Sequence, residues 1–342
     1  MWDIMLKKHY GRNGKCLFIL ATCVLIVCIV YLTNKTSLNI PQVNRVRNYI
    51  PVIRFISNEQ RITIRPSEVK QDIEKFKRNH FMTVNGDGRL GNQMFQVASL
   101  IGTAFRYNYT PIIPPRYRLL NNSFDLLQPQ DIHMNNAGIF HEEKSGTYDI
   151  NIESLSYGKN WTLNGYFQSW KYFHNYREKI LALFKFNDRI KSKAIEVLKG
   201  LVTDGRTSVG VHVRRGDKAQ PGEQKLGNSV ATSLYMMKAL HFFRKNITNP
   251  ILVVVSDDRL WPRAHVKGPD IVYAVTGFPE IDMAILTLCN HTIITVGSFG
   301  WWGAYISGGI TVYFSNYPHR GSFLATQFDN SGYYLPEWIG ME

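Results

Sequence analysis

Two adjacent arginines end an apolar run in the middle of the chain, 208-SVGVHVRRGDK-218. The alternation of valines at 209–213 predicts a buried β-strand. A guanidinium is always charged, and its planar fork matches a phosphate with two hydrogen bonds. Because open α/β sheets bind ligands beyond the carboxyl ends of their strands, we expect Arg214 and Arg215 to hold a phosphate or diphosphate, with Asp217 positioning them. A basic surface turn closed by an ion pair is the alternative.

A histidine lies within the same predicted strand. Strand alternation puts His212 on one face with Arg214, while Val211 and Val213 fall on the other. A polar side chain inside a buried strand needs a partner. His212 therefore favours a ligand site over a surface turn.

A glycine-rich turn, 86-GDGRLGNQMFQ-96, follows a predicted strand at 81–84 and opens a helical run. Its glycine spacing fits the dinucleotide fingerprint, but the acidic residue expected about 20 positions later to hold a ribose is missing. This argues against a nicotinamide-dependent oxidoreductase. Backbone N–H groups of such a turn can still bind an anion, and a tight turn without a ligand is the alternative.

Paired acids follow another apolar run, 251-ILVVVSDDR-259. Asp257 and Asp258 could bind a metal, but the chain has no Asp-x-Asp triplet of the kind typical of metal-dependent sugar transferases. A carboxylate can also accept from guanine N1–H and the 2-amino group together, a pairing that adenine cannot make. We expect one of the two acids simply to cap the next helix.

A fourth motif, 292-TIITVGSFGWWGAYISGG-309, leads from a strand through a glycine turn into a helix of small residues. Ser298 at the helix start can donate to phosphate. Trp301 and Trp302 are candidates to line an acceptor sugar site, because aromatic faces stack on pyranose rings. Core packing is the expectation for at least one of them.

These motifs need a scaffold of parallel strands to bring them together. Short β-branched runs alternate with helical stretches in the second half of the chain, which is typical of a parallel sheet covered by helices on both faces. The predicted strands are 209–213, 251–255, 271–275, 292–296 and 311–314, and the predicted helices are 233–245 and 280–289. A further helix is expected at 179–198.

The N-terminus carries 17 consecutive uncharged positions at residues 16–32. At roughly 1.5 Å per residue this run spans roughly 25 Å, the short end of a membrane-crossing helix. No small-residue cleavage pattern follows it, so an uncleaved signal anchor is favoured over a signal peptide. All six N-x-[ST] sequons come after it, which predicts a lumenal C-terminal region glycosylated at Asn34, Asn108, Asn121, Asn160, Asn246 and Asn290.

Charge and cysteine content narrow the function further. Residues 1–80 hold 14 Lys and Arg against 5 Asp and Glu, so +9 of the formal net charge of +14 precedes the globular region. This argues against a nucleic-acid-binding protein, which would have its basic patch on the folded domain. Cys289 is the one cysteine outside the anchor, so the folded part has no internal disulfide.

Together the motifs resemble those of glycosyltransferase family 11, the α1,2-fucosyltransferases. The matching blocks are GRLGNQMFQ (88–96), VGVHVRRGD (209–217), the acidic strand end at 256–258 and TVGSFGWWGAYISGG (295–309). The resemblance implies a GT-B-type α/β fold of two facing Rossmann-like domains, preceded by a single transmembrane helix. The expected organisation is a cytoplasmic tail (1–15), the anchor (16–32), a stem (33–79), an acceptor-side part (80–205) and a GDP-fucose-binding part (206–342).

The resemblance also implies the reaction. L-fucose would move from GDP-β-L-fucose to the 2-hydroxyl of a galactose-terminated glycan, with inversion and without an essential metal or other cofactor, at the Golgi membrane. The diphosphate would be held by Arg214 and Arg215, the guanosine by His212 with Asp257 or Asp258, and the remaining donor contacts would come from Ser298, Gly91 and Asn92.

The departing GDP gains negative charge, which fixed cations must take up where no metal does. Inversion also benefits from a base on the acceptor hydroxyl. Asp217 and Glu223 are the candidates, with Asp217 the more structural of the two.

Two alternatives stay open. One is a fucosyltransferase of another linkage, including a protein O-fucosyltransferase. The other is a lumenal glycan-binding protein without catalysis, against which the intact set of His212, Arg214 and Arg215 argues. The sequence leaves a homodimer open.

Overall fold

A computed structural model describes residues 64–76, 80–124, 134, 136–202 and 205–342. The chain divides into two units at residues 55 and 56, and everything below concerns the second unit, Ile56–Glu342. The predicted tail, anchor and most of the stem lie outside the described residues. Within the described residues, no helix combines the length and the apolar character needed to cross a bilayer.

The first sheet has four parallel strands in the order β2-β1-β4-β3. The predicted strand before the glycine-rich turn is β1. The strands are β1 (Phe81–Asn85), β2 (Thr110–Ile112), β3 (Gly138–His141) and β4 (Trp161–Asn164).

One long helix, α6, follows the glycine-rich turn and is buried along most of its length. It ends where Asn108 takes the left-handed conformation that closes many helices. The α-helices of this part are α5 (Pro66–Glu74), α6 (Leu90–Tyr107), α7 (Arg118–Ser123) and α8 (Arg177–Leu183). Its short 3-10 turns are η1 (Ile150–Ser154), η2 (Trp170–Tyr172) and η3 (His174–Tyr176).

The second sheet has six parallel strands in the order β10-β9-β8-β5-β6-β7. All five strands predicted for this region are present, and a sixth, β10, comes from the C-terminus. Their bounds are β5 (Thr207–Val213), β6 (Pro250–Ser256), β7 (Ile271–Tyr273), β8 (His291–Ile294), β9 (Thr311–Phe314) and β10 (Ile339–Met341).

The helices of the second part include both of those predicted, as α11 and α13. The helix predicted at 179–198 is two helices, because Asn187 accepts a hydrogen bond from the backbone N–H of Ile190 and starts a new helix. The helices are α9 (Asp188–Leu201), α10 (Pro221–Leu226), α11 (Ser233–Asn246), α12 (Trp261–His265), α13 (Pro279–Leu288), α14 (Ser298–Ser307), α15 (Phe323–Gln327) and α16 (Asn330–Tyr333), with the 3-10 turn η4 (Asp217–Ala219).

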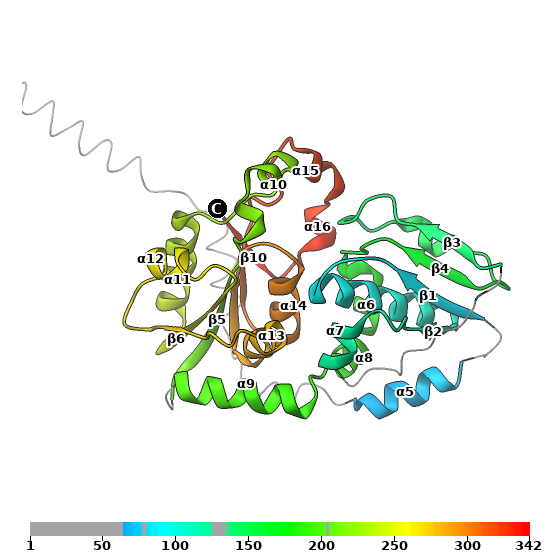
Figure 1. The fold of residues 1–342 in the computed structure, drawn as a ribbon, viewed down its shortest axis with the longest axis horizontal. Helices are drawn as coiled ribbons and strands as arrows, with labels where there is room; N and C mark the ends of the chain where they lie inside the picture. Colours follow the sequence, from blue (N-terminus) through cyan, green and yellow to red (C-terminus); the bar gives the residue numbers. More distant parts are fainter. Residues whose placement is uncertain (1–63, 77–79, 125–133, 135, 203–204) are drawn as a thin grey trace, which may run out of the picture. The chain divides into compact units, whose positions relative to one another are not determined.

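Helices α6 and α14 lie side by side between the two sheets (Figure 1). A Cβ on Gly91 of α6 would stand 2.7 Å from the backbone nitrogen of Phe299 in α14, so only glycine allows this approach. The two halves of the described fold are therefore joined through the helices that follow two of the predicted motifs.

The division of the sequence does not follow the division of the fold. Helix α9 lies before residue 206, the predicted start of the second part, yet Ile190 and Ala194 pack with residues of the six-stranded sheet. Near the C-terminus, Tyr333 and Trp338 return to the hydrophobic cluster that also contains α6. The core of the first half thus includes residues from the end of the sequence.

Candidate active site

The arginine motif lies where the strand order of the second sheet reverses. From β5 the chain continues to β6 and β7 on one side and to β8, β9 and β10 on the other. Ligands of open α/β sheets bind at this position, at the carboxyl ends of the strands. The backbone N–H of Arg214 donates to the hydroxyl of Thr295 at 2.8 Å, which ties the end of β5 to the loop after β8.

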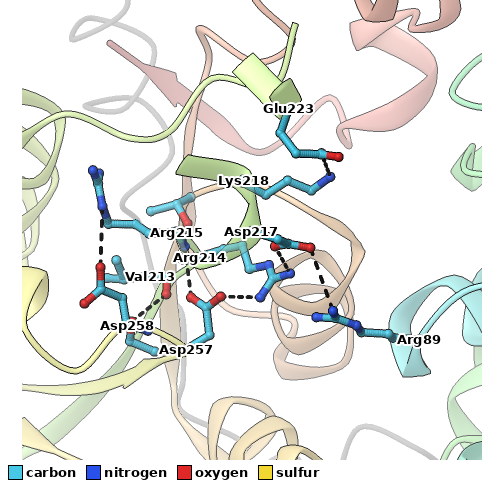
Figure 2. A network of polar contacts seen from close by, with 11 residues as sticks. Arg89, Val213, Arg214, Arg215, Asp217, Lys218, Glu223, Asp257 and Asp258 are labelled. Carbon is cyan, nitrogen blue, oxygen red and sulfur yellow. Dashed lines mark hydrogen bonds and ion pairs between the residues drawn. The ribbon is translucent and has the colours of Figure 1, made fainter. Parts of the chain in front are cut away.

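Arg214 is held between two carboxylates (Figure 2). Its guanidinium donates to Asp217 on one side and to Asp257 on the other, and 18% of its side chain is exposed. Two fixed carboxylates orient the cation before any ligand arrives, which is what preorganised electrostatic stabilisation requires.

Arg215 is fixed by a separate set of contacts. Its guanidinium lies 4.3 Å from the centre of the Trp261 ring, donates to the carbonyl oxygen of Ala231 at 3.1 Å, and has Asp258 at 3.9 Å. Its backbone N–H donates to Asp257 at 2.9 Å. Neither arginine of the motif extends freely into solvent.

His212 is buried beneath the start of α14. Its ring stacks on Phe299 with centroids 5.3 Å apart, and a Cβ on Gly300 would overlap its Nδ1 atom. Burial, followed by the charge of Arg214, lowers the pKa of His212 to about 3, so the ring is neutral. Nδ1 has no hydrogen-bond partner in the described part of the chain, which is uncommon for a buried nitrogen.

Ser298 and Asn92, predicted as donor contacts from separate motifs, bond directly to each other. The Ser298 hydroxyl donates to Asn92 Oδ1 at 2.6 Å, and Gln168 donates to the same oxygen at 3.0 Å. The structure therefore brings Gly91, Asn92 and Ser298 together where α6 meets α14.

The paired acids have different surroundings. Asp258 caps α12, accepting from the backbone N–H groups of Leu260 and Trp261 at 2.9 and 3.0 Å, so the expected cap is this residue. Asp257 instead accepts from both arginines of the motif. No cluster of three or more metal-ligating side chains occurs among the residues that the structure describes.

A cavity of about 230 Å³ opens at the carboxyl ends of β6 and β7, between Asp257, Asp258 and Asp282. Asp282 accepts from the hydroxyl of Thr276 at 2.6 Å, and burial raises its pKa. Sequence reasoning missed Asp282, because an acid in the first turn of a helix is ordinarily explained by the helix dipole.

Arg89 was also missed, although it lies within the glycine-rich motif. Its guanidinium lies 3.8 Å from Asp217, so the turn after β1 reaches the arginine motif of the second sheet (Figure 2). Asp217 is thus shared between two arginines, Arg89 and Arg214.

Glu223, the second candidate for the catalytic base, also has hydrogen-bond partners. Glu223 accepts from Lys218 at 2.7 Å and from Asn228 at 2.9 Å. Both Asp217 and Glu223 therefore stand against donors and cations, an arrangement that suits positioning better than proton abstraction.

The predicted sugar-binding role of Trp301 and Trp302 is wrong. Both side chains have no exposed surface. Trp301 lies 4.5 Å from Phe95 and donates its ring N–H to Tyr333, while Trp302 stacks on Phe173 at 5.5 Å. Because their faces are covered within the core between α6 and α14, neither can stack on a sugar.

The described sequon asparagines fall into two groups. Asn108, Asn246 and Asn290 are exposed, whereas Asn121 and Asn160 are partly buried. Asn160 accepts from the backbone N–H of Phe81 at 2.8 Å. Asn34 lies outside the described residues.

Two parallel α/β halves, the second with two arginines at the switch point of its sheet, define a Rossmann-like protein. The family model Glycosyl transferase family 11 matches residues 50–342, and the chain belongs to this family. The resemblance noted in the motifs is thereby confirmed.

Curated relatives cover most of the chain. Galactoside 2-alpha-L-fucosyltransferase SEC1 of Bos taurus is 36% identical over 275 residues, which are 77% of this chain and 74% of that protein. Galactoside alpha-(1,2)-fucosyltransferase 2 of Sus scrofa is 35% identical over 271 residues, 76% of this chain and 79% of that protein.

Solved structures match more distantly. Fucosyltransferase NodZ from Bradyrhizobium has a TM-score of 0.43 at 13% identity, covering 66% of this chain and 92% of that one. POFUT1 in complex with GDP-fucose has a TM-score of 0.46 at 12% identity, covering 71% and 99%.

Proposed function

We propose that this protein transfers L-fucose from GDP-β-L-fucose to the 2-hydroxyl of a terminal β-galactoside, with inversion of the anomeric centre. Family membership and the names of its relatives support this reaction. The observation that carries it is the position of Arg214 and Arg215 at the switch point of the second sheet. In this proposal the two halves are the facing domains of a GT-B-type fold.

The arginines would hold the diphosphate of the donor. As the bond between fucose and phosphate breaks, negative charge grows on GDP, and fixed guanidinium groups stabilise it by a few kcal/mol each, roughly. Ser298 stands at the N-terminus of α14, where backbone N–H groups favour an anion. Asn92 reaches the same point from the first half.

The guanine would lie in the cavity at the ends of β6 and β7. Asp258 caps α12, and Asp257 accepts hydrogen bonds from the two arginines. Asp282 is therefore the acid that would accept from guanine N1–H and the 2-amino group. This changes the expected assignment, which gave that role to Asp257 or Asp258. His212, which is neutral and stacks on Phe299, would contact the guanosine from beneath α14.

We also propose that the protein is a single-pass type II membrane protein of the Golgi with a lumenal catalytic region. The uncharged run at residues 16–32 and the sequons that follow it support this topology. The reaction would need no metal, because the arginines supply the positive charge. Its partners would be GDP-fucose and a galactose-terminated glycan.

A direct assay tests the reaction. The full chain is incubated with GDP-fucose and a panel of glycans and glycoproteins, and the linkage in the product is determined. Fucose α1,2-linked to galactose is the expected product. Fucose on another hydroxyl or on a protein side chain would establish one alternative, and glycan binding without turnover would establish the other.

A further inference from the structure

The first sheet has a second cavity, of about 360 Å³, at the carboxyl ends of β1 and β4. Asn85 and Asn164 are paired in register at these strand ends. From β1 the chain passes to β2 on one side, while β4 and β3 lie on the other, so the strand order reverses here as well. By the rule that applies to the second sheet, this is where the first sheet should bind a ligand.

The walls of this cavity carry both hydrogen-bond donors and acceptors. Arg116 uses one guanidinium nitrogen to donate to Val84 and Asn85, at 3.1 and 2.7 Å, and has further N–H groups. The Asp87 carboxylate also lines the cavity and has no hydrogen bond or ion pair with any described residue. Asn164 adds an amide.

This mixture fits a neutral, hydroxyl-rich ligand better than a phosphate. A fully ionised phosphate accepts hydrogen bonds and is repelled by a carboxylate, whereas each sugar hydroxyl both donates and accepts. One arginine and one aspartate balance in charge. The partly exposed ring of Tyr166, 39% accessible, adds an apolar face of the kind on which a pyranose stacks.

The backbone that carries Tyr166 is fixed by hydrogen bonds to Glu142. Glu142 accepts from the backbone N–H groups of Tyr166 and Phe167 at 2.8 and 2.7 Å. A Cβ on Gly165 would stand 2.6 Å from the side chain of Glu142, so the chain can make this turn with glycine alone. The backbone at Tyr166 is therefore held in place before a ligand binds, which lowers the entropy lost on binding.

The cavity is also connected to the arginine motif of the second sheet through the turn after β1. Asp87 lies two residues before Arg89, so their Cα atoms are at most about 7 Å apart. The Arg89 guanidinium lies 3.8 Å from Asp217, which also holds Arg214. The turn after β1 therefore contributes Asp87 to this cavity and Arg89 to the arginine motif, so one short segment connects the two sites.

We propose that this cavity is the subsite for the acceptor sugar, with Asp87, Arg116 and Asn164 binding its hydroxyls and Tyr166 stacking on its ring. The inference rests on the proposed function, and it gives the acceptor role to residues of the first sheet in place of Trp301 and Trp302.

The test uses the full chain with Asp87→Asn, Arg116→Met and Tyr166→Ala. Three quantities are measured for each: KM for a β-galactoside, KM for GDP-fucose, and the slow hydrolysis of GDP-fucose without acceptor. We expect the acceptor KM to rise at least tenfold, while the other two stay within twofold. Tyr157→Ala is the matched control, because that tyrosine is 72% exposed and lies outside the cavity.

Two outcomes overturn the inference. One is an acceptor KM that is unchanged in all three variants, and the other is a loss of GDP-fucose hydrolysis as large as the rise in acceptor KM. Binding of methyl β-galactoside, followed by saturation-transfer NMR, separates this inference from the proposed function. Failure of the wild-type chain to turn over GDP-fucose, with sugar binding that Tyr166→Ala abolishes, would refute the function and keep the subsite. Turnover of GDP-fucose by the wild type, with sugar binding unchanged in Tyr166→Ala, would keep the function and refute the subsite.

Discussion

The hydroxyl of Ser298 donates a 2.6 Å hydrogen bond to the side-chain oxygen of Asn92, 206 positions earlier in the chain. Each residue lies in the first turn of a helix that follows a strand, one in each sheet. The bond therefore connects the two halves of the fold at the point where the nucleotide diphosphate is proposed to bind. Groups from both halves would meet the donor there.

Replacing Arg214 by lysine should abolish most of the transfer. Lysine keeps the positive charge but loses the fork that Asp217 and Asp257 hold. We expect kcat to fall about 100-fold or more, in line with the loss of one preorganised donor, while the melting temperature changes little. Arg189→Ala, on the exposed face of α9, is the control, and wild-type kinetics in Arg214→Lys would refute the assignment.

Asp282 should determine which nucleobase the donor site prefers. Inosine diphosphate lacks the 2-amino group, so the wild type should bind GDP about 10-fold more tightly or better, the worth of a hydrogen bond to a charged group. Asp282→Asn should bind GDP more weakly and lose that preference. Calorimetric titration of both nucleotides checks this, and a variant that still discriminates would contradict the assignment.

Trp302→Phe should affect stability and leave acceptor recognition intact. The side chain is fully buried, and its ring N–H has no partner within the described structure, so only packing is lost. We expect a cost of about 1–3 kcal/mol in the free energy of unfolding. The acceptor KM should stay within twofold, and a selective rise in that KM would restore the sugar-stacking role.

Glu142→Gln should change how stability depends on pH. Burial raises the pKa of Glu142 to about 8 from its ordinary 4.5, so the folded state binds the proton more tightly than the unfolded chain. This contribution to stability is complete below pH 4.5 and is lost as the pH rises to about 8.

The glutamine variant should therefore lose less stability than the wild type between pH 5 and pH 8. Chemical denaturation at several pH values measures this, with the exposed neighbour Glu143→Gln as control. Parallel pH profiles for wild type and Glu142→Gln would show that the carboxyl does not titrate in this range.

Removal of divalent metals should leave the transfer rate nearly unchanged. The proposed mechanism stabilises the departing GDP with Arg214 and Arg215, so EDTA removes nothing that the reaction needs. Initial rates with EDTA and with added Mn²⁺ check this. Complete loss of activity that Mn²⁺ restores would require a metal in the mechanism.

Periodicity in the sequence was enough to predict most of the second sheet. The β-branched runs at 209–213 and 251–255 are buried on both faces, which makes them mainly apolar stretches with clear ends, interrupted only by His212. The end of the apolar run at Val213 also predicted that Arg214 and Arg215 follow a strand, and β5 ends at Val213. β10 has one β-branched residue and a central glycine, so its sequence shows no strand pattern.

The roles of single side chains depended on contacts that a sequence does not display. Trp301 and Trp302 follow a glycine turn typical of a binding site, but α14 is enclosed between two sheets and its aromatics are core residues. The cavity of the first sheet is lined by Asn85, Arg116 and Asn164, which come from three separate segments. The pairing of β1 with β4 on one side and with β2 on the other brings these segments together.

The return of Tyr333 and Trp338 to the cluster around α6 has a consequence for biosynthesis. A nascent chain emerges from its N-terminus, so α6 is made more than 200 residues before the aromatics that complete its surroundings. The first half cannot finish its core during translation and has to wait for the final segment. A frameshift or premature stop before Tyr333 would therefore damage the earliest part of the globular region as much as the latest.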